Sequence, residues 1–179
     1  LQRPATIIFT SGSTGTPKAA LHTFSNHYHN ALGSNANIAL RPGDRWLHSL
    51  PLYHVGGLSI LFRCLLAGAT AVFPEHGTQV GESIAALSAT HVSLVSTQLL
   101  RLLREGADLS ALEAVLMGGG PVPASLVDEA VARGLPVHTS YGLTEMASQV
   151  TTTPSGASPE ELHTSGRVLP HREVSISGE

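Results

Sequence analysis

Hydroxyl groups and glycines surround a single lysine near the start of the chain, in the segment FTSGSTGTPKAAL (residues 9–21). The glycines allow backbone angles that other residues avoid, and consecutive backbone N–H groups in such a loop can form an anion-binding nest. Lys18 adds a positive charge, so these residue types suit a polyphosphate. The segment is not a Walker A loop, because Pro17 precedes the lysine and Ala19 follows it. Taken alone, its composition is equally typical of a flexible surface loop.

A histidine and an arginine stand out in the apolar segment LPLYHVGGLSILFRCLLAGA (residues 50–69). His54 lies between a proline-bounded turn and a glycine pair, where it could face a ligand or be an ordinary surface or core histidine. Arg63 lies in an otherwise apolar run, and a buried arginine needs an anionic or hydrogen-bonding partner. The alternative is that the stem of Arg63 packs in the core while its guanidinium reaches water.

Two further segments follow apolar runs that are typical of strands. In LMGGGPVP (residues 116–123), three glycines could let a planar ligand approach the backbone, or could form a tight turn into a helix. In TSYGLTEMASQ (residues 139–149), Tyr141 could stack on a base, Thr144 could bind a phosphate, and Glu145 offers the hard oxygen ligand that suits Mg²⁺. Thr144 and Glu145 are equally typical of the start of a helix.

Short apolar runs alternate with helical patterns along the chain, which is the signature of β-α-β units. The predicted strands are residues 5–9, 69–73, 91–96, 114–118 and 135–140, and the predicted helices are residues 24–39, 82–89, 97–106 and 123–134. From residue 69 on, the strand starts recur about every 22 residues, but the segments share no consensus, so a solenoid is not favoured. The sequence therefore predicts an α/β fold, a mostly parallel, doubly wound sheet flanked by helices.

Three local expectations accompany this fold. The strand at residues 5–9 is apolar and β-branched, which predicts a buried strand. Gly106 and Gly134 follow two of the helical patterns in the position of helix-ending glycines. Residues 151–166 are polar and rich in Pro, Gly and Ser, which predicts a surface loop, and the final EVSISGE (residues 173–179) has the pattern of a strand.

The composition narrows the function classes. Hydrophobic residues make up 42% of the 179, which indicates a packed domain, and the net charge of −3 argues against nucleic-acid binding. No run of 18 apolar residues and no signal-peptide pattern appears. Cys64 is the single cysteine, so no internal disulfide can form and the cytoplasm is the expected location. The histidines lack the spacing of a zinc site. Because the chain begins at Leu1 rather than Met, we expect a piece of a longer protein.

The four motifs, taken together and in order, resemble the adenylate-forming superfamily of acyl-CoA synthetases, luciferases and adenylation domains. FTSGSTGTPKA resembles its phosphate loop, PLYHVGG its acyl-site histidine motif, GGGPVP its adenine-edge segment and YGLTE its nucleotide motif. Longer stretches, among them DRWLHSLPLYHVGGLSILFR and SYGLTEMASQV, resemble the o-succinylbenzoate–CoA ligases within that superfamily. Ala19 is a departure, since the family has Gly after the Pro-Lys pair.

The resemblance implies an ATP-dependent acid–CoA ligase that uses ATP, Mg²⁺ and coenzyme A. Such an enzyme activates the succinyl carboxylate of o-succinylbenzoate as an acyl-adenylate and transfers the acyl group to coenzyme A. Residues 1–179 are then expected to form the central portion of the AMP-binding N-terminal domain, without the C-terminal lid domain and its catalytic lysine. We therefore expect negligible turnover from these residues alone. Another acyl- or aryl-CoA synthetase, or a nucleotide-binding fragment without chemistry, stays an alternative, and the oligomeric state is open.

The resemblance also assigns roles to individual residues. The expected catalytic residues are Lys18, His54, Thr144 and Glu145, with Glu145 as the Mg²⁺ ligand. The expected nucleotide-binding residues are Thr10, Ser11, Gly12, Ser13, Thr14, Gly15, Lys18, Gly119, Gly120, Pro121, Tyr141, Gly142 and Thr144. In the acyl site, His54 is expected to flank the reacting carboxylate. Since the diacid carries a second, aromatic carboxylate, we expect Arg63 to be its counter-ion, directly or through water.

Overall fold

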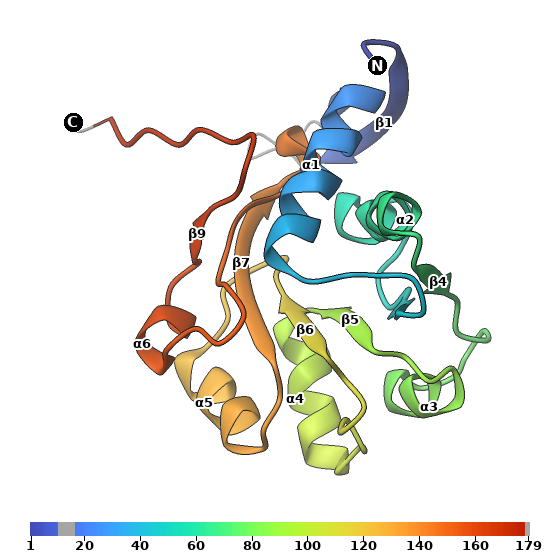
Figure 1. Ribbon diagram of the computed structural model, residues 1–179, viewed down its shortest axis with the longest axis vertical. Helices are drawn as coiled ribbons and strands as arrows, with labels where there is room; N and C mark the ends of the chain where they lie inside the picture. Colours follow the sequence, from blue (N-terminus) through green and yellow to red (C-terminus); the bar gives the residue numbers. More distant parts are fainter. Residues whose placement is uncertain (11–16, 178–179) are drawn as a thin grey trace.

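A computed structural model describes residues 1–10 and 17–177 of the chain. Within these residues, seven strands form one sheet in the order β4-β3-β5-β6-β7-β8-β9 (Figure 1). The five strands from β4 to β7 are parallel, and β8 and β9 are antiparallel additions at one edge. The strands are β3 (Arg45–Leu47), β4 (Thr70–Val72), β5 (His91–Leu94), β6 (Ala114–Met117), β7 (Val137–Leu143), β8 (Ser148–Thr152) and β9 (Arg167–Val168). The predicted α/β fold with a mostly parallel sheet is confirmed.

Helices cover both faces of the sheet, and the alternation of side chains along β6 shows how. Ala114 and Leu116 point into a core with Ile60 of α2, whereas Val115 and Met117 point into a second core with the helices of the other face. The first face carries α1 (Phe24–Asn37) and α2 (Val55–Ala67), and the second carries α3 (Val80–Ala86), α4 (Ser96–Glu105) and α5 (Ala124–Ala132). Helices therefore pack against both faces of the parallel strands.

The start of the chain forms a separate two-stranded antiparallel hairpin, β1 (Pro4–Thr10) and β2 (Lys18–Thr23) (Figure 1). The strand predicted at residues 5–9 is confirmed, but the expectation that it is buried is wrong. Ile7 and Phe9 are 61% and 68% exposed, and Ile8 between them is buried. The reason is that β1 pairs with β2 rather than entering the large sheet, so only one face of the hairpin meets the domain.

The segment at residues 151–166 is more structured than its composition predicts. Its first residues complete β8, Thr152 and Thr153 are fully buried, and a short helix, α6 (Pro159–Leu162), follows. At the C-terminal end, residues 173–177 form no strand, contrary to their pattern. The helix-ending glycines are confirmed, because Gly106 directly follows α4 with a φ of 66° and Gly134 follows the last capping residue of α5, Arg133, with a φ of 77°.

Candidate active site

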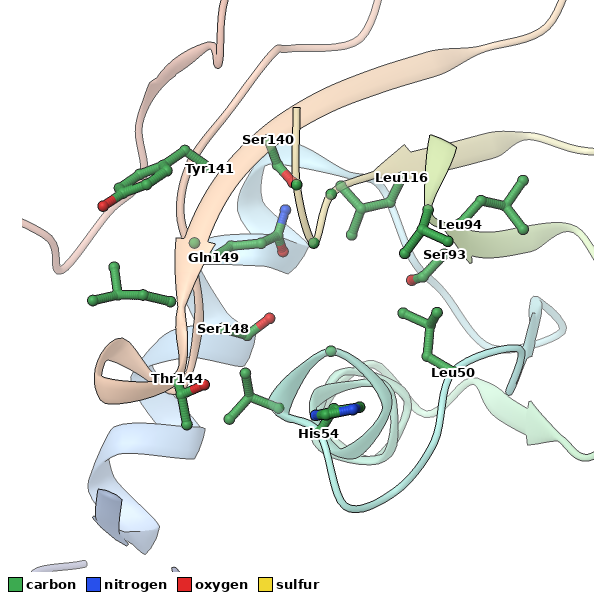
Figure 2. A pocket seen from close by; sticks show the side chains of 18 of the residues that line it. Leu50, His54, Ser93, Leu94, Leu116, Ser140, Tyr141, Thr144, Ser148 and Gln149 are labelled. Carbon is green, nitrogen blue, oxygen red and sulfur yellow. The ribbon is translucent and has the colours of Figure 1, made fainter. Parts of the chain in front are cut away.

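A cavity of about 950 Å³ opens at the carboxyl ends of β5, β6 and β7, beside the start of α2 (Figure 2). Parallel α/β sheets bind ligands at this edge. In Figure 2, His54 and Leu50 lie on one side of the opening and Ser140 and Leu116 on the opposite side. Of the residues singled out in the sequence, the cavity is lined by His54, Arg63, Gly119, Gly120, Pro121, Tyr141, Gly142 and Thr144. Three of the four motifs thus meet at one site.

The glycine segment after β6 brings bare backbone to the cavity wall. A Cβ at Gly118 would lie 2.9 Å from the Ser140 hydroxyl oxygen, so this position admits no side chain without movement. Gly119 has a φ of 81°, the left-handed region that favours glycine, whereas a Cβ at Gly120 would meet nothing within 4 Å. A flat ligand can therefore lie against Gly120 without meeting a side chain there.

Arg63 is buried within α2 and has no acidic partner among residues 1–10 and 17–177. Its side chain is 1% exposed, and its guanidinium lies 5.3 Å from the centre of the Trp46 ring. Nη2 donates to the Ser148 hydroxyl at 3.2 Å, but Nε and Nη1 have no partner among the described residues. Burial lowers the pKa of Arg63 to about 10, which leaves it charged at neutral pH. Arg63 borders the cavity, and a buried cation whose donors lack partners is suited to an anionic ligand.

Ser148, the partner of Arg63, has an unusual backbone. Its φ is 118°, and the preceding Ala147 has a φ of 57°, a conformation that side-chain-bearing residues rarely adopt. Ser59 also donates to the Ser148 hydroxyl, at 3.3 Å. This geometry turns the chain from the end of β7 back into β8 and presents Ser148 to the cavity beside Arg63.

His54 is the residue that precedes the first turn of α2, and its exposed ring borders the cavity. The backbone N–H of His54 donates to the Pro51 carbonyl at 3.1 Å, which closes the turn before the helix. A Cβ at Gly57 would lie 2.3 Å from the same carbonyl oxygen, so the glycine pair lets the turn pack closely on the helix. The motif therefore sets the ring of His54 at the mouth of the cavity.

The phosphate-loop motif is described only at its two ends. Thr10, the last residue of β1, pairs with Lys18, the first residue of β2, and Lys18 is exposed. Neither side chain lines the cavity. Five of the candidate residues lie outside the described residues, namely Ser11, Gly12, Ser13, Thr14 and Gly15. Their assignment to phosphate binding stays a prediction.

Thr144 and Glu145 begin a short 3₁₀ turn, η1 (Thr144–Met146), directly after β7. Thr144 lines the cavity, and Glu145 is exposed and does not. No group of three or more His, Cys, Asp or Glu side chains that could hold a metal ion occurs among residues 1–10 and 17–177. Mg²⁺ with nucleotides is usually held by one or two carboxylates together with phosphate oxygens and water, and the exposed Glu145 is suited to that mode.

Comparison with known proteins places the chain in a family. The model of the AMP-binding enzyme family matches residues 1–179. The chain belongs to the AMP-binding enzymes. This confirms the resemblance seen in the four motifs, three of which line the cavity.

Several relatives and solved structures of this family carry closely related names. The 2-succinylbenzoate–CoA ligase of Bacillus pumilus is 42% identical over 180 residues, which cover 98% of this chain and 37% of the relative. The o-succinylbenzoate CoA synthetase of Bacillus subtilis, solved with its acyl-adenylate intermediate, matches with a TM-score of 0.91 at 39% identity, over 99% of this chain and 37% of that one. The same enzyme solved with ATP and magnesium ion matches with a TM-score of 0.90, also at 39% identity, over 99% of this chain and 38% of that one. The chain thus spans little more than a third of these AMP-binding enzymes.

Sequence reasoning missed part of the cavity of this AMP-binding enzyme. Ser93, Leu94 and Val95 line it from the end of β5, and their place at the end of a predicted parallel strand was the signal that could have found them. Ser148 and Gln149 also line it, and the Gln149 side-chain oxygen is buried without a partner in the described part of the chain. No sequence pattern marks these two, because the turn at Ala147 decides where they point.

No helix in the described part of the chain is long and apolar enough to cross a membrane.

Proposed function

We propose that the chain is the central part of the AMP-binding N-terminal domain of an ATP-dependent acid–CoA ligase that acts on 2-succinylbenzoate. The observation that carries this proposal is that one cavity is lined by the glycine segment after β6, by Thr144 and by Arg63. The buried guanidinium of Arg63 has two nitrogens without a partner among the described residues. The names of relatives 42% identical to this chain, and of structures with TM-scores near 0.9, support it. Since the chain spans about 37% of those relatives, we propose that the remaining parts of such an enzyme complete the site.

The open end of the cavity fits ATP. The volume of the whole cavity lies at the upper end of the usual range for small-molecule sites, about 300–1,000 Å³. The adenine would lie against Gly119, Gly120 and Pro121, with Tyr141 against its face and Gly142 beside it. Thr144 would contact the α-phosphate. Thr10, Lys18 and the loop between them would hold the outer phosphates, and Glu145 would share Mg²⁺ with phosphate oxygens.

In the first step of the proposed reaction, an oxygen of the succinyl carboxylate attacks the α-phosphorus of ATP. The bond from that phosphorus to the oxygen of the leaving pyrophosphate breaks, which gives an acyl-adenylate and pyrophosphate. Protein groups contribute mainly by position and charge, because such a transfer needs little covalent participation from the enzyme. Lys18 would stabilise the departing pyrophosphate, and His54 at the cavity mouth would flank the attacking carboxylate. Mg²⁺ neutralises charge on the phosphates when it is bound.

In the second step, the sulfur of coenzyme A attacks the acyl carbon and the bond to AMP breaks, while the thiol gives up its proton. The acyl group would stay in the cavity through both steps. Its aromatic carboxylate would meet Arg63, whose Nε and Nη1 are free to donate. A paired guanidinium and carboxylate is strong and directional, so this contact selects a diacid over a monoacid.

The proposed enzyme works on ATP and coenzyme A, which are metabolites of the cytosol. We accordingly propose a cytoplasmic location, which is supported by the single, buried Cys64, since one cysteine cannot form an internal disulfide.

ATP–pyrophosphate exchange in the full-length protein tests the function. We expect rapid exchange with 2-succinylbenzoate and much slower exchange with fatty acids and simple benzoates, followed by thioester formation when coenzyme A is added. Equal or faster exchange with another acid would identify a different acyl-CoA synthetase. ATP binding without exchange for any acid would identify a nucleotide-binding protein without chemistry. The 179-residue chain by itself should bind ATP and form negligible thioester.

A further inference from the structure

His22 joins two segments to which the proposed function assigns phosphate contacts. It lies in β2, the strand that begins at Lys18, and its side chain is 1% exposed. Its Nε2 lies 2.6 Å from the backbone carbonyl oxygen of Thr144, 122 positions further along the chain. Since a carbonyl oxygen can only accept, Nε2 carries a hydrogen and donates it. The hairpin therefore holds the turn after β7 by a buried hydrogen bond.

The carbonyl that His22 contacts is also the one that closes the turn. The backbone N–H of Ala147 donates to the same Thr144 oxygen at 3.0 Å, and this bond defines η1. A carbonyl oxygen has two lone pairs, so both are used. Ala147 has a positive φ of 57°, a conformation that needs support from its surroundings. His22 thus acts on the turn that presents Thr144 and Glu145.

The second ring nitrogen of His22 is held as well. Its Nδ1 lies 3.3 Å from the Thr6 hydroxyl oxygen, which lies 2.9 Å from Nε2 of His27. In the neutral state Nδ1 of His22 bears no hydrogen, so the Thr6 hydroxyl donates to it and accepts from His27. His27 is stacked on Phe62 of α2 at 4.4 Å between ring centres. The imidazole of His22 is therefore fixed in one orientation by β1, α1 and α2 together.

We propose that His22 is a positioning residue that holds the Thr144–Met146 turn against the β1–β2 hairpin. Through it, the two segments assigned to the phosphates keep a constant separation, so that Thr144 and Glu145 meet the α-phosphate and Mg²⁺ while the hairpin holds the outer phosphates. The proposal rests on the proposed function for its consequence, and on the buried hydrogen bond for its structure. Its effect should be larger on the adenylation step, because that step uses both segments, whereas only the Thr144 contact with the α-phosphate remains once pyrophosphate has left.

Two substitutions separate the hydrogen bond from the rest of the side chain. The amide nitrogen of Gln is the same number of bonds from Cα as Nε2 of His, so His22→Gln keeps a donor for the Thr144 carbonyl. The side chain of Asn is one bond shorter and reaches only the position of Nδ1. His22→Asn therefore keeps the polar contact to Thr6 and loses the hydrogen bond to the Thr144 carbonyl oxygen. The pair is thus matched in polarity and differs in reach.

Amide hydrogen exchange of the full-length protein without ligands gives the first readout. We expect His22→Asn to speed exchange at residues 144–147 by about fivefold, the effect of losing one buried hydrogen bond, and His22→Gln to stay near wild type. ATP–pyrophosphate exchange gives the second. We expect the Asn variant to lose about tenfold in rate and the Gln variant to keep most of it, with KM for the acid the same in both. Thioester formation from supplied acyl-adenylate should fall less in the Asn variant than pyrophosphate exchange does.

The outcomes separate the two proposals. If the Asn and Gln variants behave alike in amide exchange, or if the Asn variant slows both half-reactions equally, His22 has no positioning role. If wild-type protein shows no pyrophosphate exchange with any acid, the proposed function is wrong, and the amide exchange of the turn still shows whether His22 holds it.

Discussion

The two ends of the cavity are built from different kinds of groups. The proposed acyl end is deep: Arg63 is 1% exposed and is held by Ser148 in the middle of the fold. The proposed nucleotide end offers bare backbone at Gly120, and the exposed side chains assigned to the outer phosphates and Mg²⁺, Lys18 and Glu145, lie outside the cavity lining. A buried charge interacts strongly and is hard to replace, whereas exposed charges are screened by water and salt. The difference predicts that selectivity for the acid depends on one residue, and that handling of the nucleotide is spread over several.

The largest expected effect comes from the deep end. Replacing Arg63 by Ala, or by Met to preserve volume, removes the proposed counter-ion of the aromatic carboxylate. Loss of one partner of a buried charge pair costs about 2–5 kcal/mol, so kcat/KM for 2-succinylbenzoate should fall by about 30-fold to several thousandfold, mainly through KM. Steady-state kinetics should show KM for ATP close to wild type. An unchanged KM for the diacid would remove Arg63 from the acyl site.

A substrate analogue supplies the control for that variant. 4-Oxo-4-phenylbutanoate has the succinyl carboxylate and lacks the aromatic one, so wild-type protein should use it poorly. Arg63→Met should narrow the difference in kcat/KM between the two acids, since the monoacid lacks the aromatic carboxylate that the arginine would bind. Equal losses for both acids would point to damage to the fold rather than to a lost contact.

At the phosphate end, Glu145→Gln tests the proposed Mg²⁺ ligand. The carboxylate is exposed, and other Mg²⁺ ligands would come from phosphates and water, so the expected loss is moderate. We expect the Mg²⁺ concentration for half-maximal pyrophosphate exchange to rise about tenfold, with KM for the acid unchanged. Glu82→Gln, an exposed carboxylate of α3 that does not line the cavity, is the matched control. Identical Mg²⁺ curves for both variants would remove Glu145 from the metal site.

Much of the contrast between the two ends of the cavity could be predicted from the sequence, because the motifs lie at strand ends. The runs at 114–118 and 135–140 predicted adjacent parallel strands, and two of the four motifs follow these strands directly. The burial of β1 could not be predicted, since an apolar pattern shows that a strand forms but not which strand it pairs with. The contacts of His22 with Thr144 and of Arg63 with Ser148 join positions far apart in the chain, so no local pattern contains them.

A smaller effect is expected where the nucleotide would lie on backbone. A Cβ at Gly120 would meet no atom within 4 Å, so Gly120→Ala should leave the free energy of unfolding within about 0.5 kcal/mol of wild type. If the adenine lies against this residue, the added methyl group should weaken ATP binding about fivefold by keeping the ring from close approach. Calorimetric titration with ATP measures this loss. Unchanged affinity would place the adenine elsewhere in the cavity.

The smallest effect at neutral pH is expected at His27, which links the hairpin to α2 through Thr6 and Phe62. Burial, with a smaller contribution from nearby His22, lowers the pKa of His27 from 6.5 to about 4 in the folded chain. Above pH 6.5 the ring is neutral whether the chain is folded or unfolded, so it adds no pH dependence. Between pH 6.5 and 4 the unfolded chain binds a proton that the folded chain does not, and stability falls as the pH falls, by about 3 kcal/mol in total.

His27→Gln isolates this contribution, because its amide nitrogen can still donate to Thr6 but does not titrate. We expect the variant to match wild type in ATP–pyrophosphate exchange at pH 7 within about twofold. Amide exchange of the hairpin at increasing urea concentrations gives its free energy of unfolding. Between pH 7 and pH 4.5 this free energy should fall less in the variant than in wild type. If the free energy of unfolding falls with pH by the same amount in both proteins, His27 takes up its proton without opening the hairpin. The hairpin and α2 would then be less closely joined than the contacts of Thr6 and Phe62 indicate.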